Sequence, residues 1–115
     1  MNIEEIQAYC LSKSHTSEDM PFDDSTLVFR VCGKIFALLS LEDSLSINLK
    51  CDPLKALELR EQFSSITPGY HMNKIHWNTV MLNGSLDNSI VLELIDHSYQ
   101  QVVLKLPLKL RKELL

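Results

Sequence analysis

Hydrophobic and polar residues alternate along several segments of the chain, and this period of two predicts β-strands. Residues 27–31 and 34–39 form two such segments, and Cys32-Gly33 between them predicts the tight turn of a hairpin. The segment 45–50 alternates most regularly, with aliphatic residues on one face and polar residues on the other. We therefore expect one face of this strand to be buried, while its polar face contacts water or a partner.

Two further strands are indicated by other features of the sequence. The segment 20–22 contains a proline and is typical of the end of an edge strand, because proline cannot donate to a central ladder. Residues 74–82 form a mainly apolar segment that ends at the Asn-Gly turn 83–84. Residues 64–69, which include a Pro-Gly pair, are predicted to form a loop.

Apolar residues recur at helical spacing in four other segments. A helix over residues 2–13 begins with an Asn-x-x-Glu pattern that predicts a capping box. A second helix, 53–63, follows an Asp-Pro pair that supplies an N-cap and a proline in the first turn. The longest amphipathic pattern covers 87–103, and after a proline residues 108–115 predict a short terminal helix.

This order of elements predicts an α+β fold of one domain, residues 1–115. We expect a two-layer sandwich in which an antiparallel sheet of about five strands carries helices on one face. With 115 residues, 45% hydrophobic and 23% charged, the chain can bury a core without disulfides, and its three cysteines are predicted to be reduced thiols. No apolar run approaches the roughly 20 residues of a membrane span. We therefore expect a cytoplasmic protein without a membrane partner.

The sequence contains no recognised catalytic or metal-binding constellation. His71 and His76 are five residues apart, an offset that points them to opposite faces of an extended chain, and no acidic or cysteine neighbour completes a ligand set. Ser98 lies within a predicted helix, where its hydroxyl is expected to bond the preceding turn. The three glycines fall at turns and form no phosphate-binding loop. We predict no catalytic residue, no metal site and no cofactor.

A set of cations and aromatic rings remains as the candidate site. A net charge of −4 disfavours a protein whose whole surface coats nucleic acid, but a local patch can pair phosphates and stack on bases. Trp77 has an alternative role, which is to pack the sheet against the predicted helix 87–103. The set comprises Arg30, Lys34, Lys50, Lys74, Tyr70, His76, Trp77 and Tyr99.

Several short blocks of sequence carry a resemblance to a known family. These are Pro21-Phe22, Gly33-Lys34 with Phe36-Ala37, Leu49–Pro53, Pro68–Lys74 with His76-Trp77, and Ser98-Tyr99 before Leu106-Pro107. Through them the chain resembles the bacterial YjbR/MmcQ-like proteins. The resemblance implies a fold likened to CyaY and to secretion chaperones, described as a double wing, and a DNA-binding role proposed from that fold. It implies no enzyme activity or cofactor, and it assigns Lys34, Lys50, Asn73, Lys74, His76, Trp77, Ser98 and Tyr99 to the family signature.

Three hypotheses about function follow from these features. The first is a non-enzymatic binding module for DNA, in which Lys34, Lys50 and Lys74 contact phosphates and Tyr70, His76 or Trp77 stack on bases. The second is a protein-interaction or chaperone-like domain, monomeric or homodimeric, that receives a protein or peptide on an open sheet face or edge. The third is an enzyme acting on a small anionic ligand, with Lys74 as anchor and His76 as acid or base.

Overall fold

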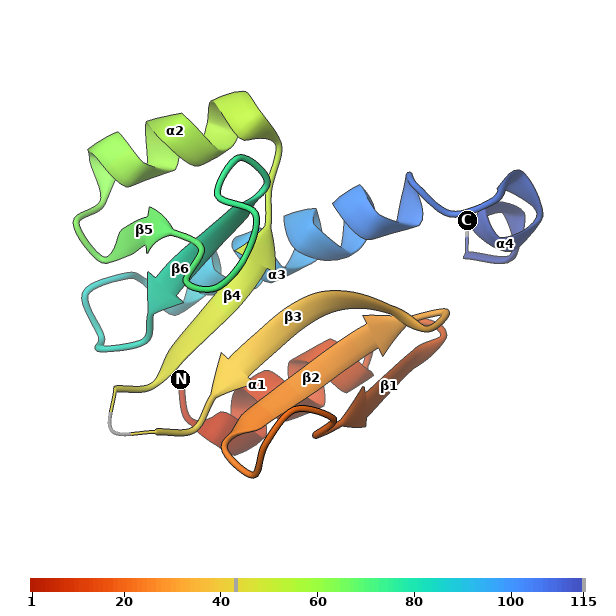
Figure 1. Ribbon diagram of the computed structural model, residues 1–115, viewed down its shortest axis with the longest axis horizontal. Coiled ribbons are helices and arrows are strands. Elements are labelled where there is room, and N and C mark those ends of the chain that lie inside the picture. The colour runs from red at the N-terminus through yellow and green to blue at the C-terminus, as the bar shows by residue number, and fades with distance from the viewer. Residues whose placement is uncertain (43, 115) are drawn as a thin grey trace.

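The chain forms an open six-stranded antiparallel sheet with helices packed on one of its faces (Figure 1). The computed structural model describes residues 1–42 and 44–114. The strands are β1 Thr16–Asp19, β2 Thr26–Val31, β3 Lys34–Ser40, β4 Ser46–Lys50, β5 Ile66–Pro68 and β6 Trp77–Met81. The helices are α1 Ile3–Leu11, α2 Pro53–Gln62, α3 Asn88–Val103 and α4 Leu108–Leu114.

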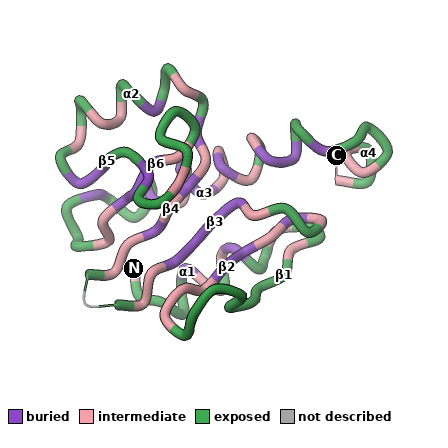
Figure 2. Tube along the Cα trace, viewed as in Figure 1, coloured by how far each residue is buried: buried purple, intermediate pink, exposed green. Residues whose placement is uncertain are grey.

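The predicted α+β class with helices on one sheet face is confirmed. Neighbouring strands follow the order β1-β2-β3-β4-β6-β5, so β6 pairs with β4 and leaves β5 at the edge. Side chains from the core-facing row of the sheet meet α1 and α3 in one cluster, which Figure 2 shows as buried segments of the central strands and α3. That row, in register across five strands, is Leu27, Leu39, Ile47, Val80 and Ile66.

The predicted helix starts are confirmed by their capping bonds. The backbone N–H of Glu5 donates to Asn2 Oδ1 at 2.8 Å, and Asn2 N–H donates back to Glu5 Oε1 at 3.2 Å, which completes the capping box. Asp52 accepts from the N–H of Lys55 at 3.2 Å, and Pro53 occupies the first turn of α2. The hairpin turn is also confirmed, with Cys32 at φ 49° and Gly33 at φ 82°.

The Ser98 hydroxyl connects β3 and β4 at a point where their backbone pairing is interrupted. Our prediction that it bonds a carbonyl of its own helix was wrong. Phe29 pairs with Ala37 but Arg30 pairs with Ile35, so Phe36 is an extra residue that bulges into the core. The pairing of β3 with β4 runs from Ser40 back to Ala37 and does not continue to Phe36. Figure 1 shows that β4 turns away toward α2 at this end. The buried Ser98 hydroxyl fills the gap: it donates to Phe36 O at 2.5 Å and accepts from Lys50 N–H at 2.8 Å.

Two predictions about the region 64–82 were wrong in detail. The expected loop 64–69 contains the short strand β5, so the sheet has six strands where we expected about five. Three residues ending in a proline are too few to show a period of two, and only pairing with β6 defines them as a strand. The strand expected over 74–82 begins only at Trp77, because Asn73 Oδ1 accepts from the N–H groups of Ile75 and His76 and closes a turn.

The C-terminal helix α4 lies at one end of the molecule, beyond the end of α3 (Figure 1). Its Leu110 and Leu114 are partly buried against the core cluster, whereas Leu108 is exposed. Over residues 1–42 and 44–114, no helix combines the length and the apolar character that crossing a membrane requires.

Candidate functional site

The sheet face opposite α1 and α3 is left uncovered, and its residues differ in chemistry from those of the core face. Side chains alternate between the two faces along each strand. In β4, Ile47 and Leu49 are buried in the core, while Ser46 and Asn48 lie on the open face. Two rows cross this open face in register: Val28, Leu38, Asn48 and Thr79, and then Thr26, Ser40, Ser46 and Met81.

A broad groove of about 800 Å³ lies on the open face. Its floor comes from four neighbouring strands, β2, β3, β4 and β6, and its rims come from the loops that follow β1, β3 and β5. Hydroxyl and amide groups share the floor with aliphatic and thioether side chains. The described lining residues are Phe22, Asp23, Thr26, Ile35, Leu38, Ser40, Glu42, Ser44, Ser46, Asn48, Tyr70, His71, Met72, Thr79 and Met81.

Aromatic side chains stand exposed on opposite rims of the groove. Phe22, in the loop after β1, is 63% exposed, and Tyr70, in the loop after β5, is 68% exposed. The rings of Tyr70 and His71 lie 4.0 Å apart between centroids. Tyr70 N–H donates to the Thr79 hydroxyl at 2.9 Å, and that hydroxyl donates to Asn48 Oδ1 at 2.5 Å. The rim that carries Tyr70 is therefore anchored to the floor.

Gly69 lets the β5–β6 loop approach β6 closely. A Cβ at this position would lie 2.8 Å from Trp77 Cβ, closer than real Cβ atoms approach, and a tight 3.1 Å from Met72 Cβ. Arg60 on α2 fixes the other side of the loop: its guanidinium donates to Asn78 Oδ1 at 2.6 Å, to Trp77 O at 3.2 Å and to Lys74 O. The loop that forms one rim of the groove is thus held by both the sheet and a helix.

The rim that carries Phe22 is acidic. Asp23 accepts from Ser25 N–H at 2.9 Å, and this bond lowers the pKa of the Asp23 carboxyl. The Ser25 hydroxyl in turn donates to Glu42 Oε1 at 3.0 Å, so one serine binds both carboxylates. The described lining of the groove includes these two acids and no lysine or arginine. The negative charge of the groove is therefore not neutralised from within.

Five residues predicted from the cation and aromatic set or from the family signature lie on one loop and the strand that follows it. Tyr70, Asn73, Lys74 and His76 belong to the β5–β6 loop, and Trp77 begins β6. The side-chain oxygen of Asn73 is engaged by its own turn, and Lys74 Nζ donates to Gly69 O at 3.0 Å. Tyr70 alone among these five lines the groove.

Lys50 joins this group, because it pairs with Trp77 across β4 and β6. The two residues lie on the face opposite their buried neighbours Leu49 and Asn78, and Trp77 is partly buried. Trp77 therefore lies on the uncovered face, and its alternative role as a plug between the sheet and α3 is wrong.

The structure does not bring Lys34 and Tyr99 to this group. Lys34 pairs with the buried Val31, which places it at the end of the hairpin on the helix-covered side. Tyr99 lies in α3, where its ring packs edge-on against Phe36 at 5.4 Å and its hydroxyl donates to Ser14 O at 2.7 Å. Burial raises the pKa of Tyr99. Its role is to attach α3 to the turn after α1, a tertiary contact that the sequence did not reveal.

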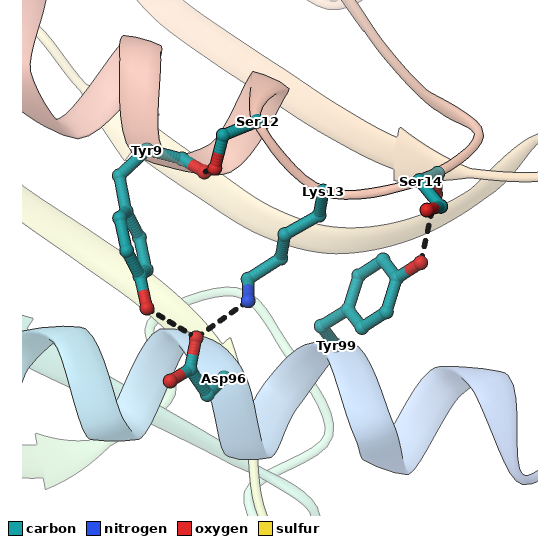
Figure 3. Close-up of polar contacts among 6 residues, drawn as sticks. All are labelled: Tyr9, Ser12, Lys13, Ser14, Asp96 and Tyr99. Atoms are coloured by element: carbon teal, nitrogen blue, oxygen red, sulfur yellow. Dashed lines mark hydrogen bonds and ion pairs between the residues drawn. The ribbon is translucent and has the colours of Figure 1, made fainter. Parts of the chain in front are cut away.

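A polar cluster joins α1 to α3 within the helix layer that contains Tyr99 (Figure 3). Asp96 accepts from the Tyr9 hydroxyl at 2.6 Å and forms an ion pair with Lys13 at 2.5 Å. The hydrogen bond to Asp96, together with burial, raises the pKa of Tyr9 to about 12. Lys13 Nζ also lies 5.0 Å from the centre of the Tyr9 ring and 5.2 Å from that of Tyr99. Because these groups are bound to one another, the cluster serves to fasten the helices.

Two further titratable groups near the helices, His97 and Cys51, are partly or fully buried. His97 Nε2 accepts from Asp52 N–H at 3.1 Å, and burial, followed by the charge of Lys55, lowers the pKa of His97. Burial raises the pKa of Cys51 to about 11, which keeps the thiol protonated. Among the described residues, no group of three His, Cys, Asp or Glu side chains is arranged to hold a metal ion.

The sequence interpretation missed most of the groove. Its candidate site included Tyr70, but not Phe22, Asp23, Glu42 or Met72. The available signal was the polar face of residues 45–50, from which we predicted contact with water or a partner. No sequence pattern indicated the rims of the groove, because they come from loops that meet the floor only in the folded protein.

The chain is an open-faced α+β domain with a groove on the uncovered face of its sheet, and comparison with known proteins identifies its family. The YjbR family model matches residues 11–101, and the chain belongs to the YjbR family. It is 38% identical over 113 residues to the Escherichia coli K12 protein YjbR, which is described as uncharacterized, and the match covers 97% of this chain and 96% of the relative. It is 43% identical over 84 residues to Escherichia coli O157:H7 YbdF, also described as uncharacterized, covering 72% of this chain and 69% of that protein.

Solved structures confirm the fold. A crystal structure of a Deinococcus radiodurans protein with a DUF419 domain superimposes with a TM-score of 0.91 and 40% sequence identity, covering 98% of this chain and 87% of that one. A crystal structure of a Pseudomonas syringae protein gives a TM-score of 0.77 and 34% identity, covering 88% of this chain and 98% of that one.

Proposed function

We propose that this protein is a non-enzymatic binding module that holds an extended polypeptide segment on the open face of its sheet. The observation that carries the proposal is the groove of about 800 Å³ on the only sheet face that the described helices leave uncovered. It crosses four strands, and the principal extents of the molecule are 39, 32 and 26 Å. A segment of about ten residues reaches roughly 34 Å when extended, which suffices to cross it.

The chemistry of the floor suits a polypeptide. Ser46 offers a hydroxyl that can donate to or accept from a peptide backbone, and the side-chain NH2 of Asn48, whose Oδ1 already accepts from Thr79, can donate to it. Leu38 and Met81 provide apolar contacts between them, and adaptable methionine side chains are frequent where varied sequences bind. A small anionic substrate would meet two carboxylates and no cation among the described lining residues. The enzymatic hypothesis, which uses Lys74 and His76, stays a prediction.

Blocking the groove tests the proposal directly. A display library of random peptides of about ten residues supplies the ligands, and fluorescence anisotropy measures their affinity. Ser46→Trp places an indole on the floor and is expected to abolish binding, while Gln100→Trp adds the same ring at an exposed position of α3 and is expected to leave it unchanged. If no peptide binds the wild-type protein, or if both variants bind equally well, the proposal is wrong.

DNA binding is the second candidate, favoured by the position of Lys50 beside Trp77 and next to the β5–β6 loop. Anisotropy with labelled duplex and single-stranded DNA at two salt concentrations tests it. Each phosphate contact is expected to contribute a slope of about −0.9 to the dependence of log affinity on log salt concentration. A joint Lys50→Ala and Lys74→Ala variant should then flatten the slope by about two units. Absence of binding at low salt would remove this candidate.

A further inference from the structure

We propose that the groove selects polypeptide segments that carry lysine or arginine side chains, an inference that rests on the proposed function. The first reason is charge complementarity. Asp23 and Glu42 share Ser25 as a hydrogen-bond donor on one rim, so two carboxylates are held close together beside the groove. Among the described residues no cation of this chain lines the groove to neutralise them. A bound segment with lysine or arginine side chains would supply the positive charge that the described lining lacks.

The one cation of β2, Arg30, already has partners within the chain. Arg30 in β2 forms an ion pair with Asp19 at 3.1 Å and also donates to Gly33 O at 3.2 Å. Its guanidinium is therefore directed toward β1 and the hairpin turn. Because Arg30 is engaged there, it does not pair with the carboxylates of Asp23 and Glu42, which can therefore pair with a cationic ligand.

The exposed rings are the second reason. Phe22 adjoins Asp23 in sequence, and Tyr70 stands on the opposite rim, each of them more than half exposed. Aromatic faces attract ammonium and guanidinium groups, and an adjacent carboxylate strengthens the preference. A cationic side chain bound in the groove would gain from contact with both the rings and the carboxylates.

The floor provides the third reason. A lysine or arginine stem is apolar along its length and polar only at its tip. Ile35 and Leu38 offer apolar contact for such a stem, while the hydroxyl groups of Thr26 and Ser40 accept hydrogen bonds from its head. Anionic segments would instead face the two carboxylates and lose affinity. The net charge of −4 also attracts cationic segments from a distance.

The test compares three peptides of about ten residues that differ only at two positions, occupied by Lys and Arg, by Gln, or by Glu. Fluorescence anisotropy at low and moderate salt measures their affinity for the purified protein. Because an exposed ion pair changes affinity by up to about fivefold, we expect the Lys/Arg peptide to bind about threefold to twentyfold more tightly than the Gln peptide. The Glu peptide should bind most weakly, and added salt should reduce the differences.

Neutral variants then locate the charge effect. Asp23→Asn with Glu42→Gln keeps the acceptor oxygens that Ser25 uses, and it should bring the affinity of the Lys/Arg peptide to that of the Gln peptide. Glu58→Gln with Glu93→Gln removes the same net charge from α2 and α3 and should preserve the preference. An equal loss in both double variants would overturn the inference, because it would show only general attraction.

A ring variant and a matched control complete the design. Phe22→Ala should weaken the Lys/Arg peptide several-fold more than the Gln peptide, while Leu104→Ala, at a residue equally exposed, should affect neither. Equal binding of all three peptides would overturn the inference and leave the proposed function standing, whereas no binding by any of them would contradict the proposed function itself. Self-association lost in the Asp23→Asn, Glu42→Gln variant, measured by sedimentation velocity, would also overturn it, because the occupant would then be a second copy of the chain.

Discussion

The two faces of the sheet are built from the same strands but differ in chemistry and in exposure. In β4, Ile47 and Leu49 point into the core, while Ser46 and Asn48, one residue away, line the groove. The covered face is apolar and closed by α1 and α3, and its few polar groups are bound to one another. The open face keeps hydroxyl, amide and carboxylate groups available. If the open face binds a peptide as we propose, stability and binding depend on alternate residues, and substitutions on the two faces should separate them.

The largest effect is expected from a cavity on the covered face. Ile47 is fully buried, and Ile47→Ala should lower the free energy of unfolding by about 2–5 kcal/mol. Its neighbour Ser46 lies on the open face, and Ser46→Ala should change stability by less than about 0.5 kcal/mol. Chemical denaturation measures both values. Similar losses for the two variants would break the comparison between the faces.

Ser98→Ala is expected to have the next largest effect, because it removes the bridge between β3 and β4. The carbonyl of Phe36 and the N–H of Lys50 would both lose their partner, at a cost of about 1–3 kcal/mol. Ser89→Ala, at an exposed position of the same helix, is the control. Faster hydrogen exchange at the Lys50 amide in the Ser98 variant alone would locate the effect at the break in the sheet, and unchanged exchange there would contradict the assignment.

The cluster that joins α1 to α3 should respond more weakly, since Asp96 is 40% exposed. Asp96→Asn is expected to reduce stability by up to about 1 kcal/mol and to bring the pKa of Tyr9 down from about 12 toward 10. Absorbance titration of tyrosinate measures this pKa. Because the folded protein holds the Tyr9 proton more tightly than the unfolded chain, stability contributed by Tyr9 is present below pH 10 and is lost as the pH rises toward 12. In the variant, the free energy of unfolding should fall less steeply as the pH rises from 10 to 12. An unchanged Tyr9 pKa would refute the role of Asp96.

The smallest expected change in stability comes from His97, and it appears at acidic pH. The folded state lowers the pKa of His97 from its ordinary value of 6.5, so it binds fewer protons than the unfolded chain below that pH. Stability contributed by His97 is therefore present above pH 6.5 and is lost as the pH falls through the folded pKa. His97→Gln keeps an acceptor for Asp52 N–H but cannot titrate, and it should reduce the acid loss in denaturation curves. A variant with the wild-type pH profile would contradict this account.

The covered face could be predicted from the sequence better than the open one. The alternation at 45–50, the Cys32-Gly33 turn and the Asn2 capping box are local patterns, and each correctly indicated its element. The strand β5 was missed because three residues carry no period, and only pairing with β6 defines it. Local patterns are therefore enough to assign strands and caps, but not short edge pairings.

The candidate site could be predicted only in part, because it combines residues that are distant in sequence. Trp77 and Lys50 meet through strand pairing, which the sequence did not specify. Tyr99 was grouped with them by its chemistry, yet α3 carries it to the opposite layer. The acidic rim depends on Ser25 bonding two carboxylates from different loops. Residue types can thus indicate a kind of chemistry, but the fold decides which of them share a surface.

The most direct test of the central claim is to map where a ligand binds. Amide chemical shifts of the isotope-labelled protein can be followed during titration with the Lys/Arg peptide. The open-face account predicts that the perturbed amides cluster at Asn48, Tyr70 and Thr79, with little change along α2 and α3. Perturbations concentrated on those helices, with the groove amides unmoved, would contradict it.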